Sequence, residues 1–206
     1  MKILDIHTHN LAATDALISV SPDSLPQQEN RLFSVGIHPW NTESVSQQEF
    51  QALERAAINS NVLAIGECGL DLLRGAPVDI QKCVFEFHIA LSEKYHKPLI
   101  IHQVKALQEI LYLKKKFHPA QPWLIHGFRG KPETVRQLIS NDLHFSIGTK
   151  TPIETIEIIP MEWLFLESDD TNDFQNLICK VSVIRGVSTD ELDAILNDNN
   201  KRFLSL

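Results

Sequence analysis

Short apolar runs alternate with longer amphipathic stretches along the chain. Eight runs have the length and the Val, Ile, Leu and Phe content of strands, at residues 3–7, 16–20, 32–36, 62–66, 98–102, 123–125, 143–147 and 163–166. Most of the stretches between them have apolar residues at helical spacing, most clearly Asp79–Tyr95. Ser46 with Glu49, and Ser188 with Glu191, have the spacing of capping boxes and predict two further helix starts.

Strands separated by helices indicate parallel βαβ units, and for eight strands the economical arrangement is an α/β fold, the closed (β/α)8 TIM barrel. An open doubly wound sheet is the alternative. Such a barrel commonly takes about 250 residues, whereas this chain has 206. We expect the shortfall in the first crossovers, on either side of the strand 16–20, where the sequence is too short or too broken for a good helix. No repeat or linker is visible, so residues 1–206 are predicted to form one domain.

Composition narrows the possible partners. The formal charge of −7 gives the chain no general attraction for a phosphate backbone, so any nucleic acid must be held locally. Three cysteines at wide spacings suggest reduced thiols and a cytoplasmic protein. No stretch approaches the roughly 20 apolar residues that cross a bilayer, and no membrane association is expected. The oligomeric state stays open, a monomer included.

Residue types that bind metal ions follow five of the strand-like runs. They are His7 and His9, Glu67, His102, His126, and Glu167 with Asp169. His7 and His9 are two residues apart on an extended strand and therefore point the same way. An isolated pair of this kind would be expected to pack in the core or cap a loop. The repetition of the pattern favours a metal site, because the carboxyl ends of all strands in a barrel open onto one face.

Six of these residues are predicted to meet as metal ligands, namely His7, His9, Glu67, His102, His126 and Asp169. Four imidazoles and two carboxylates are too many for one ion with an open position, but they suit two divalent ions about 3.5 to 4 Å apart. Mixed nitrogen and oxygen ligands fit Zn, Mn, Fe, Ni or Co better than Ca. Zinc is our first expectation, with Mn, Mg, Fe, Ni and Co as alternatives.

Several motifs around these residues resemble those of a known family. They are His7-Thr8-His9, Gly36–Pro39, Ala64–Asp71, Gln81 with Phe85 and His88, Lys97–His102, His126–Gly130 and Leu166–Asp169. In this order they closely resemble the motifs of TatD-like metal-dependent hydrolases, TIM-barrel proteins of the amidohydrolase superfamily that are often described as deoxyribonucleases. The resemblance implies that His7, His9 and Asp169 hold one ion, that Glu67 bridges, and that His102 and His126 hold the other.

The chain also departs from the family pattern. An Arg usually follows the His at the end of the fifth strand, whereas here Gln103-Val104-Lys105 follow His102. Ser168 stands where the family usually has Thr, and the family's Pro soon after is missing. These departures leave the metal centre intact but put the manner of substrate recognition in question.

The expected chemistry is attack by metal-activated water. Asp169 is predicted to take a proton from the water and to return one to the leaving oxygen, with Glu67 as the second catalytic carboxylate. Arg129 is predicted to grip a nonbridging phosphate oxygen, a surface Arg being the alternative. His38 is predicted to contact phosphate or to support a ligand, a packed His being the alternative. Glu167 is expected to support the ligands or to cap a turn.

The remaining histidines are interpreted as structural or solvated, namely His88, His96, His118 and His144. Cys68, next to Glu67, is interpreted as a packing residue, with sensitivity to oxidation as the alternative.

The leading functional hypothesis is a dinuclear, divalent-metal-dependent phosphodiesterase. It would be a TatD-like (deoxy)ribonuclease or 3'-5' exonuclease acting on DNA or RNA ends or on a small phosphoester. Because the same kind of centre attacks carbonyls, hydrolysis of an amide, lactone or ester is the second hypothesis, including esters on transfer RNA. A metal-bound interaction protein without turnover is the third.

Overall fold

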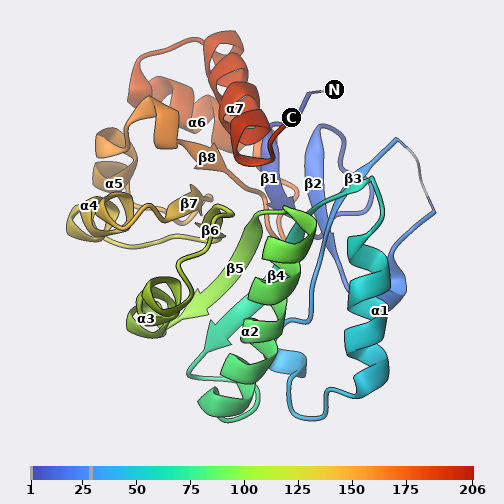
Figure 1. The fold of residues 1–206 in the computed structure, drawn as a ribbon. Helices are drawn as coiled ribbons and strands as arrows, with labels where there is room; N and C mark the ends of the chain where they lie inside the picture. Colours follow the sequence, from blue (N-terminus) through green and yellow to red (C-terminus); the bar gives the residue numbers. More distant parts are fainter. Residues whose placement is uncertain (1, 28–29) are drawn as a thin grey trace. The chain divides into compact units, whose positions relative to one another are not determined.

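The computed structural model describes residues 2–27 and 30–206 (Figure 1). Its strands are β1 (Asp5–Thr8), β2 (Ala16–Val20), β3 (Leu32–Val35), β4 (Val62–Asp71), β5 (Leu99–Val104), β6 (Trp123–Ile125), β7 (His144–Ile147) and β8 (Phe165–Leu166). They pair in the order of the sequence and close into a barrel. The predicted (β/α)8 fold is therefore confirmed, and the open sheet is wrong.

Seven α-helices are present in the part of the chain that is described, five of them between successive strands from β3 to β8 and two after β8. They are α1 (Gln47–Ala57), α2 (Val78–Tyr95), α3 (Leu107–Phe117), α4 (Pro132–Ser140), α5 (Ile153–Ile158), α6 (Phe174–Arg185) and α7 (Thr189–Phe203). Short 3₁₀ turns are η1 (Pro22–Ser24), η2 (Pro39–Asn41) and η3 (Met161–Trp163). Ser46 and Ser188 cap α1 and α7 as predicted, each accepting a hydrogen bond from the backbone N–H three residues on.

The shortened first crossovers are confirmed. No helix lies between β1 and β2, and between β2 and β3 the described residues contain only η1. Residues 28 and 29 of the predicted loop 21–30 lie outside the described residues. In the described residues, the crossovers on either side of β2 thus contain no α-helix, which accounts for the shortness of the chain.

Several predicted boundaries are wrong, and strand pairing explains two of them. β4 continues five residues past Gly66, and β5 continues two residues past His102, where the predicted strands 62–66 and 98–102 end. The two strands pair over this extension, with Asp71 opposite Val104. The gain from a paired ladder depends on the neighbouring strand, so the apolar pattern of one strand does not reveal it.

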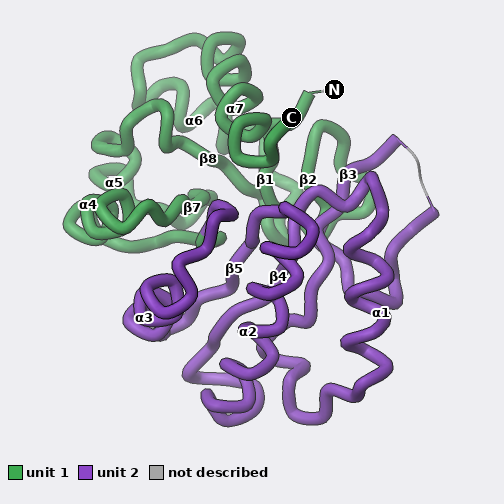
Figure 2. Tube along the Cα trace, viewed as in Figure 1, with its two compact units in different colours: residues 1–18, 125–206 green, residues 19–124 purple. Residues whose placement is uncertain are grey.

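The chain comprises two compact units (Figure 2). Unit 1 contains residues 1–18 and 125–206, and unit 2 contains residues 19–124. The assignment of a single domain to residues 1–206 stays a prediction. No helix within the described ranges is long and apolar enough to cross a membrane.

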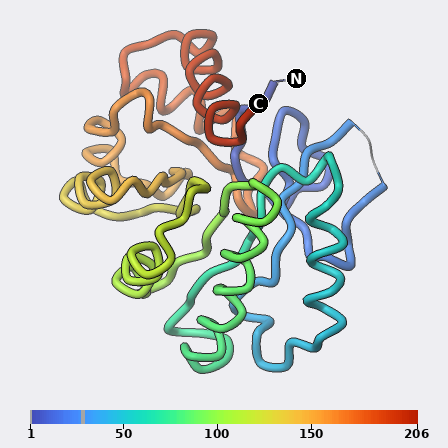
Figure 3. Tube along the Cα trace, in the orientation of Figure 1, coloured from blue at the N-terminus to red at the C-terminus, as the bar shows by residue number. Residues whose placement is uncertain are grey.

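In unit 1, β1 pairs with both β2 and β8, and α6 packs on α7 (Figure 3). The two sequence-distant parts of this unit are joined by buried hydrogen bonds, because the Asn200 amide donates to the carbonyls of Ile3 and Leu4 at 3.0 Å each. Lys2 adds an exposed ion pair with Asp193 at 2.8 Å. These contacts hold the start of β1 against α7.

In unit 2, β4 pairs with β3 on one side and β5 on the other, and α2 packs on β4 (Figure 1). The side chains of Phe85 and Trp123 are fully buried and meet edge to face, with ring centroids 5.6 Å apart. β4 is thus a central strand of this unit, and it carries Glu67 in its middle.

Candidate metal centre

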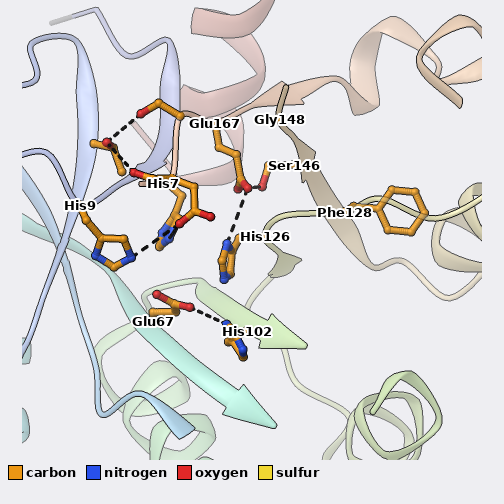
Figure 4. A network of polar contacts seen from close by, with 12 residues as sticks. His7, His9, Glu67, His102, His126, Phe128, Ser146, Gly148 and Glu167 are labelled. Atoms are coloured by element: carbon orange, nitrogen blue, oxygen red, sulfur yellow. Dashed lines mark hydrogen bonds and ion pairs between the residues drawn. The ribbon is translucent and has the colours of Figure 1, made fainter. Parts of the chain in front are cut away.

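Three predicted ligands of unit 1 come together where β1 and β8 end (Figure 4). Single donor atoms of His7, His9 and Asp169 all lie within 4.8 Å of one another. Oδ1 of Asp169 is 3.7 Å from Nε2 of His7 and 3.8 Å from Nε2 of His9. The His7 and His9 rings are 5.0 Å apart, which confirms that their side chains share one side of the strand.

The backbone fixes this arrangement. Asp169 donates its N–H to the carbonyl of His7, and its own carbonyl accepts from the N–H of His9, at 3.0 and 3.1 Å. Asp169 has φ +52°, a left-handed conformation that Asp adopts more readily than most residues. The turn after β8 therefore aims the carboxylate at the two histidines.

The donor set fits a divalent ion. Two ligands each about 2.0 to 2.2 Å from zinc in tetrahedral geometry lie about 3.4 Å apart, close to the measured separations. Burial adds a second argument, because the His7 side chain has no exposure, whereas those of His9 and Asp169 are 39% and 28% exposed. The group therefore combines one buried ligand with two that solvent can reach. A catalytic ion needs such an open position, whereas a structural ion does not.

A second group in unit 1 contains His126, Glu167 and Asp169, whose donor atoms also lie within 4.8 Å of one another. Nδ1 of His126 is 3.7 Å from Oε1 of Glu167, and Ser146 donates its hydroxyl to Oε2 of Glu167 at 2.6 Å (Figure 4). Burial raises the pKa of Glu167, but the neighbouring charges on His126 and His7 and the Ser146 hydroxyl outweigh it and lower that pKa. Glu167 is thus a buried carboxylate rather than a turn cap.

Behind the first group lies a buried polar cluster that the sequence interpretation did not include. Asp5 accepts from the Ser168 hydroxyl at 2.6 Å and from the backbone N–H groups of Ser168 and His7 at 3.1 and 3.2 Å. Burial raises the pKa of Asp5 to about 7, against the lowering effect of these hydrogen bonds. The available signal was the two-residue spacing from Asp5 to His7, which places both on one face of β1.

Unit 2 has a group of its own, made of His38, Glu67 and His102. Oε1 of Glu67 is 2.8 Å from Nδ1 of His102 (Figure 4). It is also 3.0 Å from Nε2 of His38, and the Glu67 side chain is only 5% exposed. Asp71, which the sequence interpretation did not treat as a site residue, has Oδ2 3.4 Å from Nε2 of His102. A carboxylate at this nitrogen orients the ring with Nδ1 toward Glu67.

His88 acts in support of this group, in agreement with its structural interpretation. Its Nδ1 donates to the Val84 carbonyl at 2.7 Å, and its Nε2 accepts from the backbone N–H of Ile37 at 2.9 Å. Burial lowers the pKa of His88 to about 4, and the Ile37 N–H occupies the nitrogen that would take the second proton. A neutral imidazole thereby anchors the chain beside His38.

The other predicted residues divide between core and surface. Cys68 is fully buried, as expected of a packing residue, and burial raises the pKa of its thiol. Arg129 is exposed, and its contact with phosphate stays a prediction. The other two thiols, Cys83 and Cys179, are exposed, and all three cysteines are free.

Comparison with known proteins identifies the family. The model of the family described as TatD related DNase matches residues 23–205. The chain belongs to this family. It is 30% identical over 145 residues to the uncharacterized metal-dependent hydrolase YabD of Bacillus subtilis, covering 66% of this chain and 57% of that protein. It is 28% identical over 155 residues to the deoxyribonuclease Tat-D of Schizosaccharomyces pombe, covering 66% of this chain and 50% of that protein.

Solved structures of TatD proteins have the same fold. The TatD homologue YJJV of Escherichia coli superposes with a TM-score of 0.82 at 17% identity, over 100% of this chain and 98% of that chain. A TatD family hydrolase of Entamoeba histolytica superposes with a TM-score of 0.77 at 15% identity, over 98% and 97%. The chain spans 50% to 57% of the length of the two curated relatives above.

Proposed function

We propose that this TatD family protein is a dinuclear metal-dependent phosphodiesterase that removes nucleotides from the ends of DNA or RNA. The observation that carries the proposal is the gathering of His7, His9 and Asp169 in unit 1, with donor separations that fit a divalent ion. Family membership and a matching relative described as the 3'-5' ssDNA/RNA exonuclease TatD of Pantoea ananatis support it.

In this proposal, His7, His9 and Asp169 would hold one ion, His102 and His126 would hold the other, and Glu67 would be a ligand of both. The nitrogen and oxygen donors fit zinc first, with Mn, Mg, Fe, Ni and Co as alternatives. When bound, the ions supply a low-pKa water and neutralise charge on the phosphate.

The protein residues then have separate tasks. Asp169 accepts the proton of the attacking water and returns one to the leaving oxygen, for which its partial exposure of 28% gives it access. The buried carboxylate of Glu67 holds the imidazole of His102 in place, and the buried carboxylate of Glu167 holds that of His126. Arg129, which is exposed, pairs with a nonbridging phosphate oxygen.

The decisive experiment compares phosphoester with acyl chemistry. The purified chain is given Zn²⁺, Mn²⁺ or Mg²⁺ with end-labelled single-stranded DNA, single-stranded RNA, bis(p-nitrophenyl) phosphate and p-nitrophenyl acetate. We expect stepwise shortening of the oligonucleotides and hydrolysis of the small diester, with about two ions per chain by metal analysis. Turnover of the acetate ester alone would favour the ester hydrolase instead. Two bound ions without any turnover would favour the interaction protein.

The proposal includes a cytoplasmic location. It is supported by the free state of all three cysteines, which is typical of proteins from a reducing compartment.

A further inference from the structure

An aromatic side chain and a cation are stacked at the surface of unit 2. Trp40 lies in η2, just after β3, and is 40% exposed. Arg74 lies in the loop after β4 and is exposed, with its guanidinium carbon 3.7 Å from the centroid of the Trp40 ring. A guanidinium in this position is attracted by the ring and keeps its orientation. The charge is therefore presented at the surface in a fixed place.

Trp40 is held beside the unit 2 group. Its indole Nε1 donates to Oδ2 of Asp71 at 2.7 Å, and its backbone N–H donates to Nδ1 of His38 at 3.2 Å. Its ring centroid is 4.6 Å from that of His38 and 5.6 Å from that of His102, both edge to face. Oδ2 of Asp71 also lies 3.4 Å from Nε2 of His102, so the same carboxylate contacts the indole and the imidazole.

The loop that carries Arg74 is also anchored. Gln81 of α2 accepts from the N–H of Asp71 and donates to the carbonyls of Asp71 and Arg74, at 2.8, 2.8 and 3.0 Å. Gly75 has φ +88°, and a Cβ there would collide with the carbonyl oxygen of Pro39. A glycine at this position lets the loop pack directly against η2. The backbone segments that carry Trp40 and Arg74 are therefore both held in place.

The guanidinium of Arg74 has no carboxylate partner among the residues that the structure describes. Other cations of unit 2 do have one, since Lys82, Lys94 and Lys116 each pair with a Glu at 2.6 to 2.7 Å. Arg74 therefore keeps its forked donors available for an external anion, although the chain as a whole is negatively charged.

We propose that Trp40 and Arg74 form a subsite for single-stranded nucleic acid. Arg74 pairs with a phosphate of the strand, and the exposed part of the Trp40 ring stacks on an adjoining base. Stacking platforms combined with local positive charge are the usual means of binding single strands without sequence preference. The inference rests on the proposed function and deepens it, because a polynucleotide gains contacts here that a small phosphodiester lacks.

Equilibrium binding tests the subsite without depending on turnover. The probe is a fluorescein-labelled single-stranded DNA with phosphorothioate linkages, followed by anisotropy at several salt concentrations. We expect Arg74→Gln to weaken binding and to reduce the slope of log K against log salt by about 0.7, the value for one phosphate contact on a single strand. Arg74→Lys should keep the slope. Trp40→Leu should weaken binding about ten-fold with the slope unchanged.

Arg55→Gln is the matched control, because Arg55 is an exposed Arg on α1 of the same unit. Binding and salt slope in Arg74→Gln that match those of this control would overturn the subsite.

Kinetics separate the subsite from the proposed chemistry. The ratio of kcat/KM for the unmodified oligonucleotide to kcat/KM for bis(p-nitrophenyl) phosphate should fall about ten-fold in Arg74→Gln, mainly through KM for the oligonucleotide. A ratio equal to that of the parent protein would show that Arg74 acts only on the fold or the ligands, and would overturn the inference. Failure of the parent protein to cleave any phosphodiester would refute the proposed function, while the anisotropy result would still decide the subsite.

Discussion

Unit 1 and unit 2 each gather imidazoles around carboxylates, but in different surroundings. In unit 1 the carboxylates of Asp5 and Glu167 are buried and accept hydrogen bonds from the hydroxyls of Ser168 and Ser146. These short contacts set the positions of side chains that have little or no access to solvent. The arrangement is suited to holding charge in a fixed geometry.

In unit 2 the group leads outward to the surface. Glu67 is buried, but His102 is linked through Asp71 to Trp40, and Trp40 carries Arg74 on its exposed ring. A series of contacts that runs from a buried carboxylate to an exposed cation suits a site that must also bind a substrate. Under the proposed function, the proton-transferring Asp169 belongs to unit 1, and the proposed Trp40–Arg74 subsite belongs to unit 2.

The largest expected effect comes from Asp169→Asn. Loss of this carboxylate should reduce turnover of bis(p-nitrophenyl) phosphate by about a thousand-fold, because Asn cannot accept and return a proton. Circular dichroism should show an unchanged fold. If unit 2 carries recognition, anisotropy with the phosphorothioate probe should change far less than turnover. Normal turnover in this variant would end the proposed role of Asp169.

The next effect is a pH dependence of stability in unit 2. The pKa of His88 is about 4 in the folded chain, below its ordinary value of about 6.5, so its contribution is present above pH 6.5 and lost as the pH falls toward 4. The shift corresponds to roughly 3 kcal/mol at low pH. We expect His88→Gln to lose less stability over this range than the parent protein, measured by urea unfolding at several pH values. Parallel pH profiles for the two proteins would contradict the assignment.

A smaller effect is expected from Ser168→Ala in unit 1. The variant removes the hydroxyl that donates to Asp5 at 2.6 Å, which should cost about 1 to 2 kcal/mol of stability. Because the same cluster contacts the backbone of His7, zinc affinity should fall about ten-fold, measured by competition with a chromogenic chelator. Ser140→Ala on the exposed face of α4 is the control. Equal zinc affinity in both variants would show that the cluster does not position the ligands.

The smallest effect is expected from Arg129→Ala. An exposed Arg contributes about 1 kcal/mol to pairing with phosphate, so kcat/KM for the small phosphodiester should fall about five-fold. Hydrolysis of p-nitrophenyl acetate, if present, should change less, because the neutral ester offers no anionic oxygen. An equal effect on both substrates would argue against phosphate binding by Arg129.

The sequence allowed the fold class and the gathering of His7, His9 and Asp169 to be predicted for physical reasons. Two-residue spacing puts His7 and His9 on one face of a strand regardless of context. The ends of parallel strands share one face of a barrel, which makes Asp169 after β8 a natural companion of these residues.

The supporting residue Asp5, and Trp40 and Arg74 of the proposed subsite, could not be predicted from the sequence in the same way. Trp40 and Arg74 meet only because Gly75 allows the loop to pack on η2, which is a tertiary contact without a local signature. The spacing from Asp5 to His7 puts both on one face of β1, but the role of Asp5 depends on Ser168, which is distant in the sequence. Glu67 was expected to follow its strand, but it lies inside the longer β4, whose extension depends on pairing with β5.

The extension of β4 along β5 fixes the position of the loop that follows β4. Beyond Glu67 the two strands continue as a hydrogen-bonded ribbon, with Gly69 opposite His102 and the N–H of Leu72 donating to the carbonyl of Val104 at 3.0 Å. The loop 72–76 is therefore fixed at two places, by this ribbon and by the packing of Gly75 against Pro39. We expect its length to tolerate change less well than the side chains that it exposes, Leu72, Leu73 and Arg74.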